Sequence, residues 1–159
     1  MNTSEIKNHL NVTNMIYYSL LTGLIIFFVV VIFLTRIKTR EANAELDKIF
    51  IFLVPLFGLA MMFISRMIYN QQISKSDSKA DILQKIIFYR TAKIISWAMI
   101  EGACFLSLVA TMITLNYLYL VVFIFLIGFF ILMRPSKESF IKEMKLNSEE
   151  SDMILRRLG

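Results

Sequence analysis

Four apolar stretches dominate this sequence, and each is long enough to cross a lipid bilayer as a helix. They cover residues 15–35, 49–69, 92–115 and 117–133. A helix rises about 1.5 Å per residue, so roughly 20 apolar residues cross a hydrocarbon layer of about 30 Å. A membrane β-barrel would alternate apolar and polar residues, whereas residues 24–34 and 121–132 are continuously apolar. We therefore predict an all-α integral membrane protein built as a four-helix bundle.

The remaining chain is too short for a separate soluble domain. Of the 159 residues, 57% are hydrophobic and only 18% are charged. We expect a transmembrane domain over residues 1–134 and a cytoplasmic amphipathic tail over residues 135–159. Within the tail, residues 136–146 have the cap and spacing of a short amphipathic helix, and a second capped start follows at Ser148.

Two connections between the expected spans have distinct patterns. Residues 80–89 carry apolar side chains three and four positions apart, which predicts a helical connection with one face on the membrane surface or on another helix. Residues 36–48 mix opposite charges among good helix formers, which predicts a helical linker. Between the last two spans only Asn116 interrupts the apolar run, so we expect a tight hairpin there.

The distribution of basic residues predicts the orientation in the membrane. With the N-terminus inside, only Arg36, Lys38, Arg40 and Lys48 of the 17 basic residues lie outside. Lysine and arginine accumulate in cytoplasmic loops, so we expect both termini in the cytoplasm. The composition is rich in Ile, Lys, Asn and Phe, which is typical of bacterial proteins, and we expect the inner (plasma) membrane. The net charge of +5 is explained by topology and anionic lipid, so we do not expect a nucleic-acid partner.

The third span contains a carboxylate, Glu101, well inside its apolar run. A charged side chain at the centre of a membrane helix costs about 2.5 to 3.5 kcal/mol on insertion scales, so its usual explanation is a partner or a function. Glu101 is therefore our candidate ion-binding residue. Arg66, near the end of the second span, is the candidate ion-pair partner, although its long side chain also reaches the membrane interface.

Small side chains form a stripe along the same span. At about 100° per residue, one narrow face of the helix carries Ala92, Ser96, Ala103, Ser107, Ala110 and Thr114. Small residues let membrane helices approach closely, so we expect this stripe to be a helix-packing face. Glu101 points roughly the opposite way, beside Trp97 and Leu108, toward either a second interface or lipid.

Residues 100–110 read Ile-Glu-Gly-Ala-Cys-Phe-Leu-Ser-Leu-Val-Ala. This segment resembles the carboxylate-bearing helix of rotary ATPase c subunits, the membrane proteolipids, in which a glutamate is followed by Leu-Val and small residues. The four-span layout is also similar to that of the duplicated proteolipids of vacuolar-type ATPases. In those proteins the corresponding glutamate reversibly binds a proton or a sodium ion. The resemblance implies an ion-binding role for Glu101 alone.

These patterns lead to two hypotheses about function. The first is an accessory or scaffold protein that packs with partner helices through the small-residue face of the third span, as a homo-oligomer or with another membrane protein. The alternative is a proton- or cation-handling protein that uses Glu101. We expect no enzyme, no cofactor and no metal site, because the sequence lacks catalytic motifs and has one histidine, His9, and one cysteine, Cys104.

Overall fold

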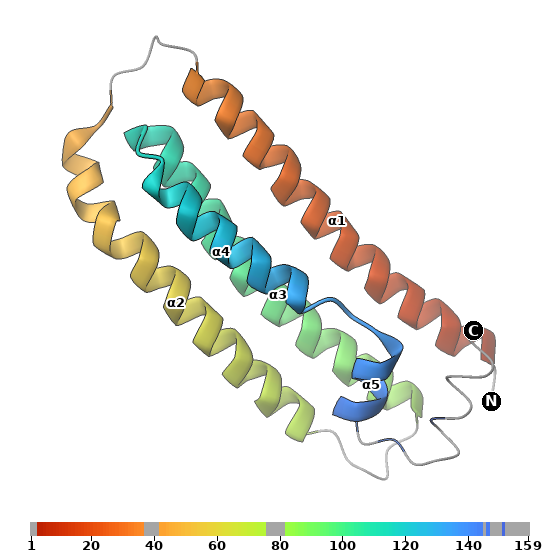
Figure 1. Ribbon diagram of the computed structural model, residues 1–159. Helices are drawn as coiled ribbons and strands as arrows, with labels where there is room; N and C mark the ends of the chain where they lie inside the picture. Colours follow the sequence, from red (N-terminus) through yellow and green to blue (C-terminus); the bar gives the residue numbers. More distant parts are fainter. Residues whose placement is uncertain (1–2, 37–41, 76–81, 145, 147–150, 152–159) are drawn as a thin grey trace.

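The computed structural model describes residues 3–36, 42–75, 82–144, 146 and 151, and these residues contain helices and no strand. The helices are α1 (Thr3–Arg36), α2 (Ala44–Ser74), α3 (Ile82–Thr114), α4 (Leu118–Leu132) and α5 (Lys137–Glu143). They form an elongated bundle in which α1 and α2 flank the pair formed by α3 and α4 (Figure 1). The prediction of an all-α fold is confirmed.

Three of these helices, α1, α2 and α3, are long and apolar enough to cross a membrane. Many large apolar side chains on the outside of the bundle face away from it, such as Phe33, Phe52 and Phe63, which are 67%, 78% and 77% exposed. Water would disfavour so much exposed apolar surface, whereas lipid tails accommodate it. The long helices therefore suggest a membrane protein.

The fourth expected span, residues 117–133, corresponds to α4, which has 15 residues. Its length of about 22 Å falls short of a hydrocarbon layer of about 30 Å. After α4 the chain passes Pro135, and Ser136 caps α5 by accepting a hydrogen bond from the backbone N–H of Ser139 at 3.0 Å. The predicted helix after residue 136 is thus present, whereas the second start expected at Ser148 lies outside the described residues.

The central helix of the bundle is α3, which packs against α1, α2 and α4. All six residues of the small-residue face are buried. Trp97 and Leu108, on the other side of α3, are also buried, in a core shared with Tyr17 of α1 and Phe130 of α4. Both sides of α3 are therefore interfaces within the chain.

The boundary of α3 differs from the expected one. The amphipathic segment 80–89 does not form a separate connecting helix, because from Ile82 onward it is the beginning of α3. Its residues Ile82, Ile86 and Tyr89 pack with Phe140 and Met144 in a second apolar cluster. Of the two neighbours expected for the apolar face of this segment, another helix is the one found, since it packs against α5. This contact holds the described part of the tail on the bundle.

The expected tight hairpin between α3 and α4 is present. Leu115 adopts a positive φ of 55°, and the Asn116 side chain accepts a hydrogen bond from the backbone N–H of Leu118 at 3.0 Å. The same Asn116 side chain donates to Asp47 of α2, and the Tyr119 hydroxyl donates to Asp47 at 2.7 Å. Asp47 thereby ties the start of α2 to this turn.

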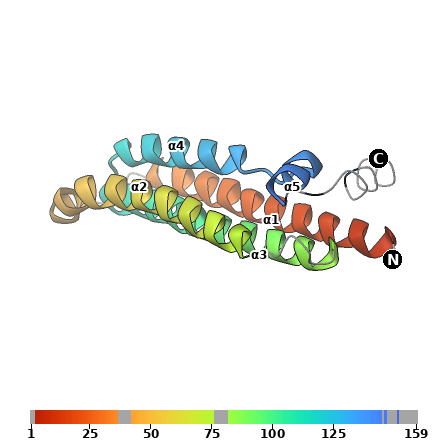
Figure 2. The same ribbon diagram turned by 90° about the horizontal axis from the view of Figure 1, so that it is seen from below.

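The two ends of the bundle carry different segments. The first turns of α1, the end of α2, the start of α3 and the whole of α5 lie at one end, as both views show (Figures 1 and 2). The end of α1, the start of α2 and the turn at Asn116 lie at the other. Of the linker expected to be helical, residues 37–41 lie outside the described residues, residues 42–43 are not helical, and Asn43 caps α2.

Candidate functional site

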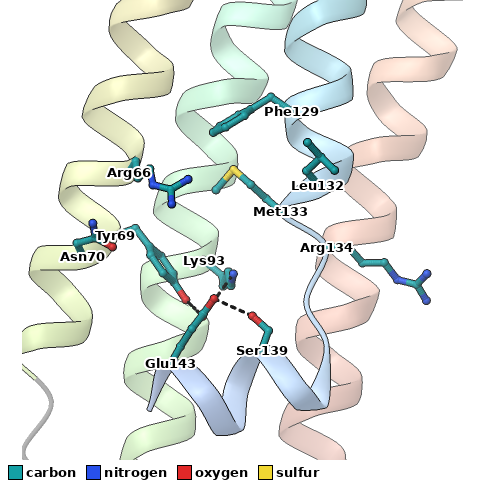
Figure 3. Close-up of a pocket in the computed structure, with 10 residues that line it drawn as sticks. All are labelled: Arg66, Tyr69, Asn70, Lys93, Phe129, Leu132, Met133, Arg134, Ser139 and Glu143. Atoms are coloured by element: carbon teal, nitrogen blue, oxygen red, sulfur yellow. Dashed lines mark hydrogen bonds and ion pairs between the residues drawn. The ribbon is translucent and has the colours of Figure 1, made fainter. Parts of the chain in front are cut away.

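A polar cavity lies between α2, α3, α4 and α5, at the level where α4 ends. Its volume is about 420 Å³, and it is bordered by side chains from all four helices and from the α4–α5 connection (Figure 3). The lining residues are Arg66, Tyr69, Asn70, Lys93, Phe129, Leu132, Met133, Arg134, Ser139 and Glu143. Basic and hydroxyl groups thus lie beside apolar residues at the end of the bundle that carries α5.

Glu143, the last residue of α5, is the hydrogen-bond acceptor at the base of this cavity. It accepts hydrogen bonds from the Tyr69 hydroxyl of α2 and from the Ser139 hydroxyl, the latter at 2.7 Å. The Lys93 ammonium of α3 lies 3.6 Å from Glu143 Oε2. One carboxylate therefore joins α2, α3 and α5, and Figure 3 shows all three partners directed toward it.

Lys93 is nearly inaccessible, with its side chain 6% exposed. Its ammonium lies 4.6 Å from the centre of the Tyr69 ring and 5.3 Å from that of Tyr89. A buried cation is strongly destabilising unless it is paired, and aromatic faces attract cations. Glu143 and the two rings together replace the water that this ammonium loses.

Arg66 is a cation of the cavity that lacks a counter-charge. Its side chain is exposed, and it forms no ion pair with any residue that the structure describes. Figure 3 shows its guanidinium directed from α2 toward the middle of the cavity, with Asn70 one turn further along the helix. The Arg134 side chain points out of the cavity, and its guanidinium lies 5.7 Å from the centre of the Tyr18 ring.

Glu101, the candidate ion-binding residue, lies elsewhere. It is about two turns beyond Lys93 along α3, or about 12 Å. Its side chain is partly exposed and has no hydrogen-bond or ion-pair partner among the described residues. The structure does not bring Arg66 and Glu101 together, because Arg66 reaches the cavity near the end of the bundle instead.

The small-residue face has a neighbour different from the one expected. The Ser96 hydroxyl donates a hydrogen bond to the backbone carbonyl of Ser65 in α2, at 3.0 Å, and Ala110 packs with Val54 of α2 and Tyr119 of α4. The face is thus covered by helices of the same chain. A partner helix cannot use it without displacing them, so any partner surface lies elsewhere.

The cluster around Glu143 was missed by sequence reasoning, which treated Lys93 only as a charge for topology. Its one signal in the sequence is a lysine at the start of an apolar span, with Tyr69 at the end of the preceding span and Tyr89 four positions before Lys93. Comparison with family models, curated proteins and solved structures finds no match for this chain. Among the described residues, no group of three histidine, cysteine or acidic side chains could hold a metal ion.

Proposed function

We propose that this protein is a small, non-enzymatic accessory or scaffold protein of the bacterial inner membrane. In this proposal α1 to α4 cross the bilayer, α4 as a short fourth pass, and both termini lie in the cytoplasm. The end of the bundle that carries α5 is then the cytoplasmic end, which agrees with the accumulation of Arg66, Lys93 and Arg134 at that level.

The observation that carries the accessory role is an apolar groove on the outside of the bundle, between α2 and α4. Its volume is about 300 Å³, and its lining includes Pro55, Gly58, Leu59, Val121 and Phe125. A Cβ at Gly58 would lie 3.4 Å from the end of the Leu126 side chain, which is ordinary van der Waals contact, so Gly58 and Leu126 lie side by side at the floor of the groove. Membrane helices associate by packing into such surfaces near small residues. We assign the groove to a helix of an unlike membrane protein.

Cysteine cross-linking in native membranes tests this assignment. Leu59 lines the groove and is 59% exposed, and Ile26 on α1 is a matched control that is also 59% exposed. In a Cys104→Ala background, we expect Leu59→Cys to cross-link to a different protein that also co-purifies stoichiometrically, while Ile26→Cys does not. A cross-link at Leu59→Cys that joins two copies of this chain would contradict the proposal. Cross-linking to another protein with equal yield from Leu59→Cys and Ile26→Cys would contradict it as well.

A second function is favoured by the unpaired state of Glu101. We infer as the alternative that this residue binds and releases a proton or cation, which is the chemistry implied by the resemblance of residues 100–110 to the proteolipids. A carboxyl group on a membrane-length helix without a fixed counter-ion is more stable when it carries a proton. Its side chain is partly exposed, so the bundle does not enclose it completely.

A hydrophobic carbodiimide tests this alternative, because it modifies protonated carboxyl groups in the membrane. We expect labelling of Glu101 that fades as the pH rises and is absent in Glu101→Gln. The matched control is Glu143→Gln, which should retain the labelling. If Glu101 stays unlabelled at acidic pH and Arg66→Ala makes it reactive, an ion pair between the two explains Glu101 and the ion-handling role fails.

A further inference from the structure

We propose that the polar cavity at the end of α4 binds the phosphate of an anionic phospholipid headgroup, with Arg66 as the principal ligand. Three cations, Arg66, Lys93 and Arg134, border the cavity against one carboxylate, Glu143, and of the three Arg134 points outward (Figure 3). Because Lys93 and Glu143 are paired at 3.6 Å, the charge of Arg66 is left uncompensated. An anion is the ligand that this imbalance attracts.

The hydrogen-bond donors that remain available fit a phosphate group. The hydroxyls of Tyr69 and Ser139 both donate to Glu143, so neither is free for a ligand. The guanidinium of Arg66 presents five N–H donors in a planar fork that can bind two phosphate oxygens at once. Asn70 adds an amide donor one turn away on the same helix, and both residues border the cavity (Figure 3).

The apolar side of the cavity distinguishes a lipid from a free anion. Phe129, Leu132 and Met133 form this side, and Leu132 is 84% exposed. They lie where α4 ends, and α4 ends well short of the end of the bundle that carries α5 (Figure 1). A headgroup held by Arg66 would let its acyl chains lie along the exposed end of α4.

The depth of the site also suits a headgroup. Basic pockets between membrane helices near the cytoplasmic surface are a recognised way of binding anionic lipids. Arg134 adds positive charge at the same level, with its guanidinium directed outward over Tyr18. A lipid at Arg66 is held by this chain alone, without a protein partner.

Native mass spectrometry of the purified full-length chain tests the inference, with phosphatidylglycerol or phosphatidylcholine supplied in mixed micelles. We expect the wild-type chain to retain phosphatidylglycerol preferentially. Arg66→Gln should bind it roughly tenfold more weakly, as expected for the loss of a charge-assisted double hydrogen bond, and Arg66→Lys should fall between them. The matched control is Lys48→Gln, a basic residue of α2 at the opposite end of the bundle, which should bind as the wild type does.

Inorganic phosphate separates the two sources of the anion. We expect millimolar phosphate to weaken lipid retention in the wild type and to have no effect on it in Arg66→Gln. This result supports phosphate recognition at Arg66. Phosphate binding that depends on Arg66 without preferential lipid retention overturns the assignment to a lipid. If the wild type retains both lipids equally, or if Arg66→Gln and Lys48→Gln lose phosphatidylglycerol binding equally, the proposed site at Arg66 is wrong. Matching thermal unfolding of all variants excludes misfolding as the cause of any loss.

Discussion

Lys93 is a buried cation whose neighbours come from three helices. Its ammonium contacts the Tyr69 ring of α2, the Tyr89 ring of α3 itself and the Glu143 carboxylate of α5. Removing one partner of such a pair is more harmful than replacing both, because the remaining charge stays away from water without compensation. The contribution of the Lys93–Glu143 pair to holding α5 on the bundle can therefore be tested by changing one partner or both.

We predict that Glu143→Gln loosens α5. Tyr69 and Ser139 donate to different oxygens of Glu143, so the amide, which keeps one oxygen, can accept from only one of them in this geometry, and it also leaves the Lys93 ammonium without a counter-charge. The backbone amides of α5 should exchange with deuterium about tenfold faster, which corresponds to about 1.4 kcal/mol of lost local stability. Hydrogen-exchange mass spectrometry in detergent micelles provides the measurement.

Two variants control this experiment. Lys142→Gln changes an exposed residue of the same helix and should leave the exchange unchanged. The double variant Lys93→Met, Glu143→Gln should recover part of the protection, because an apolar side chain then occupies the buried position. Equal acceleration by Glu143→Gln and Lys142→Gln would show that the Lys93 pair does not hold α5.

At the scale of the element, the small-residue face of α3 is covered by α2 and α4, and its small side chains allow this close packing. Ser107 is fully buried, and its hydroxyl has no hydrogen-bond partner among the described residues. Gly102, on the same helix, has no atom within 4 Å of where its Cβ would lie, apart from its chain neighbours and the adjacent backbone of its own helix. The two positions therefore differ in available space while sharing the same helical backbone.

We predict that Ser107→Leu lowers the thermal unfolding midpoint in micelles, because overpacking a filled interior costs about 1–3 kcal/mol. Ser107→Ala should be neutral or stabilising, since it removes a buried hydroxyl without a partner. Gly102→Leu should also be tolerated, because there is room for the side chain and leucine favours a helix over glycine. If Gly102→Leu were as harmful as Ser107→Leu, the outer face of α3 would be a packed interface instead.

The sequence predicted what depends on periodicity and local chemistry. Runs of apolar residues predicted the all-α class and the turn at Asn116. The cap at Ser136 predicted a helix, and helical spacing predicted the packed small-residue face. The cluster around Glu143 could not be predicted in this way, because it joins residues far apart in the chain: Tyr69 and Glu143 are 74 positions apart. The covering of the small-residue face by α2 likewise depends on which helices become neighbours, and spacing within one helix cannot specify that.

At the scale of the whole molecule, the bundle has two chemically different ends. One end carries α5 and the polar cavity with its basic residues, and the other carries the turn at Asn116 tied to Asp47. An even number of passes returns the chain to the end where it began, so the position of α5 beside the first turns of α1 agrees with a short fourth pass by α4 (Figure 1). The proposed orientation and the proposed lipid site both require the α5 end to face the cytoplasm.

Cysteine accessibility in intact cells tests this orientation with one reporter at each end. Lys75 follows the last turn of α2 and Glu45 lies in its first turn, and both side chains are exposed. In a Cys104→Ala background, a membrane-impermeant maleimide should label Glu45→Cys directly and Lys75→Cys only after the membrane is permeabilised, because basic segments stay in the cytoplasm. Labelling of Lys75→Cys in intact cells would place the cavity and Arg66 at the outer surface. The abundant anionic lipid of the cytoplasmic leaflet could then not supply the headgroup, and the orientation and the source of the lipid would fail together.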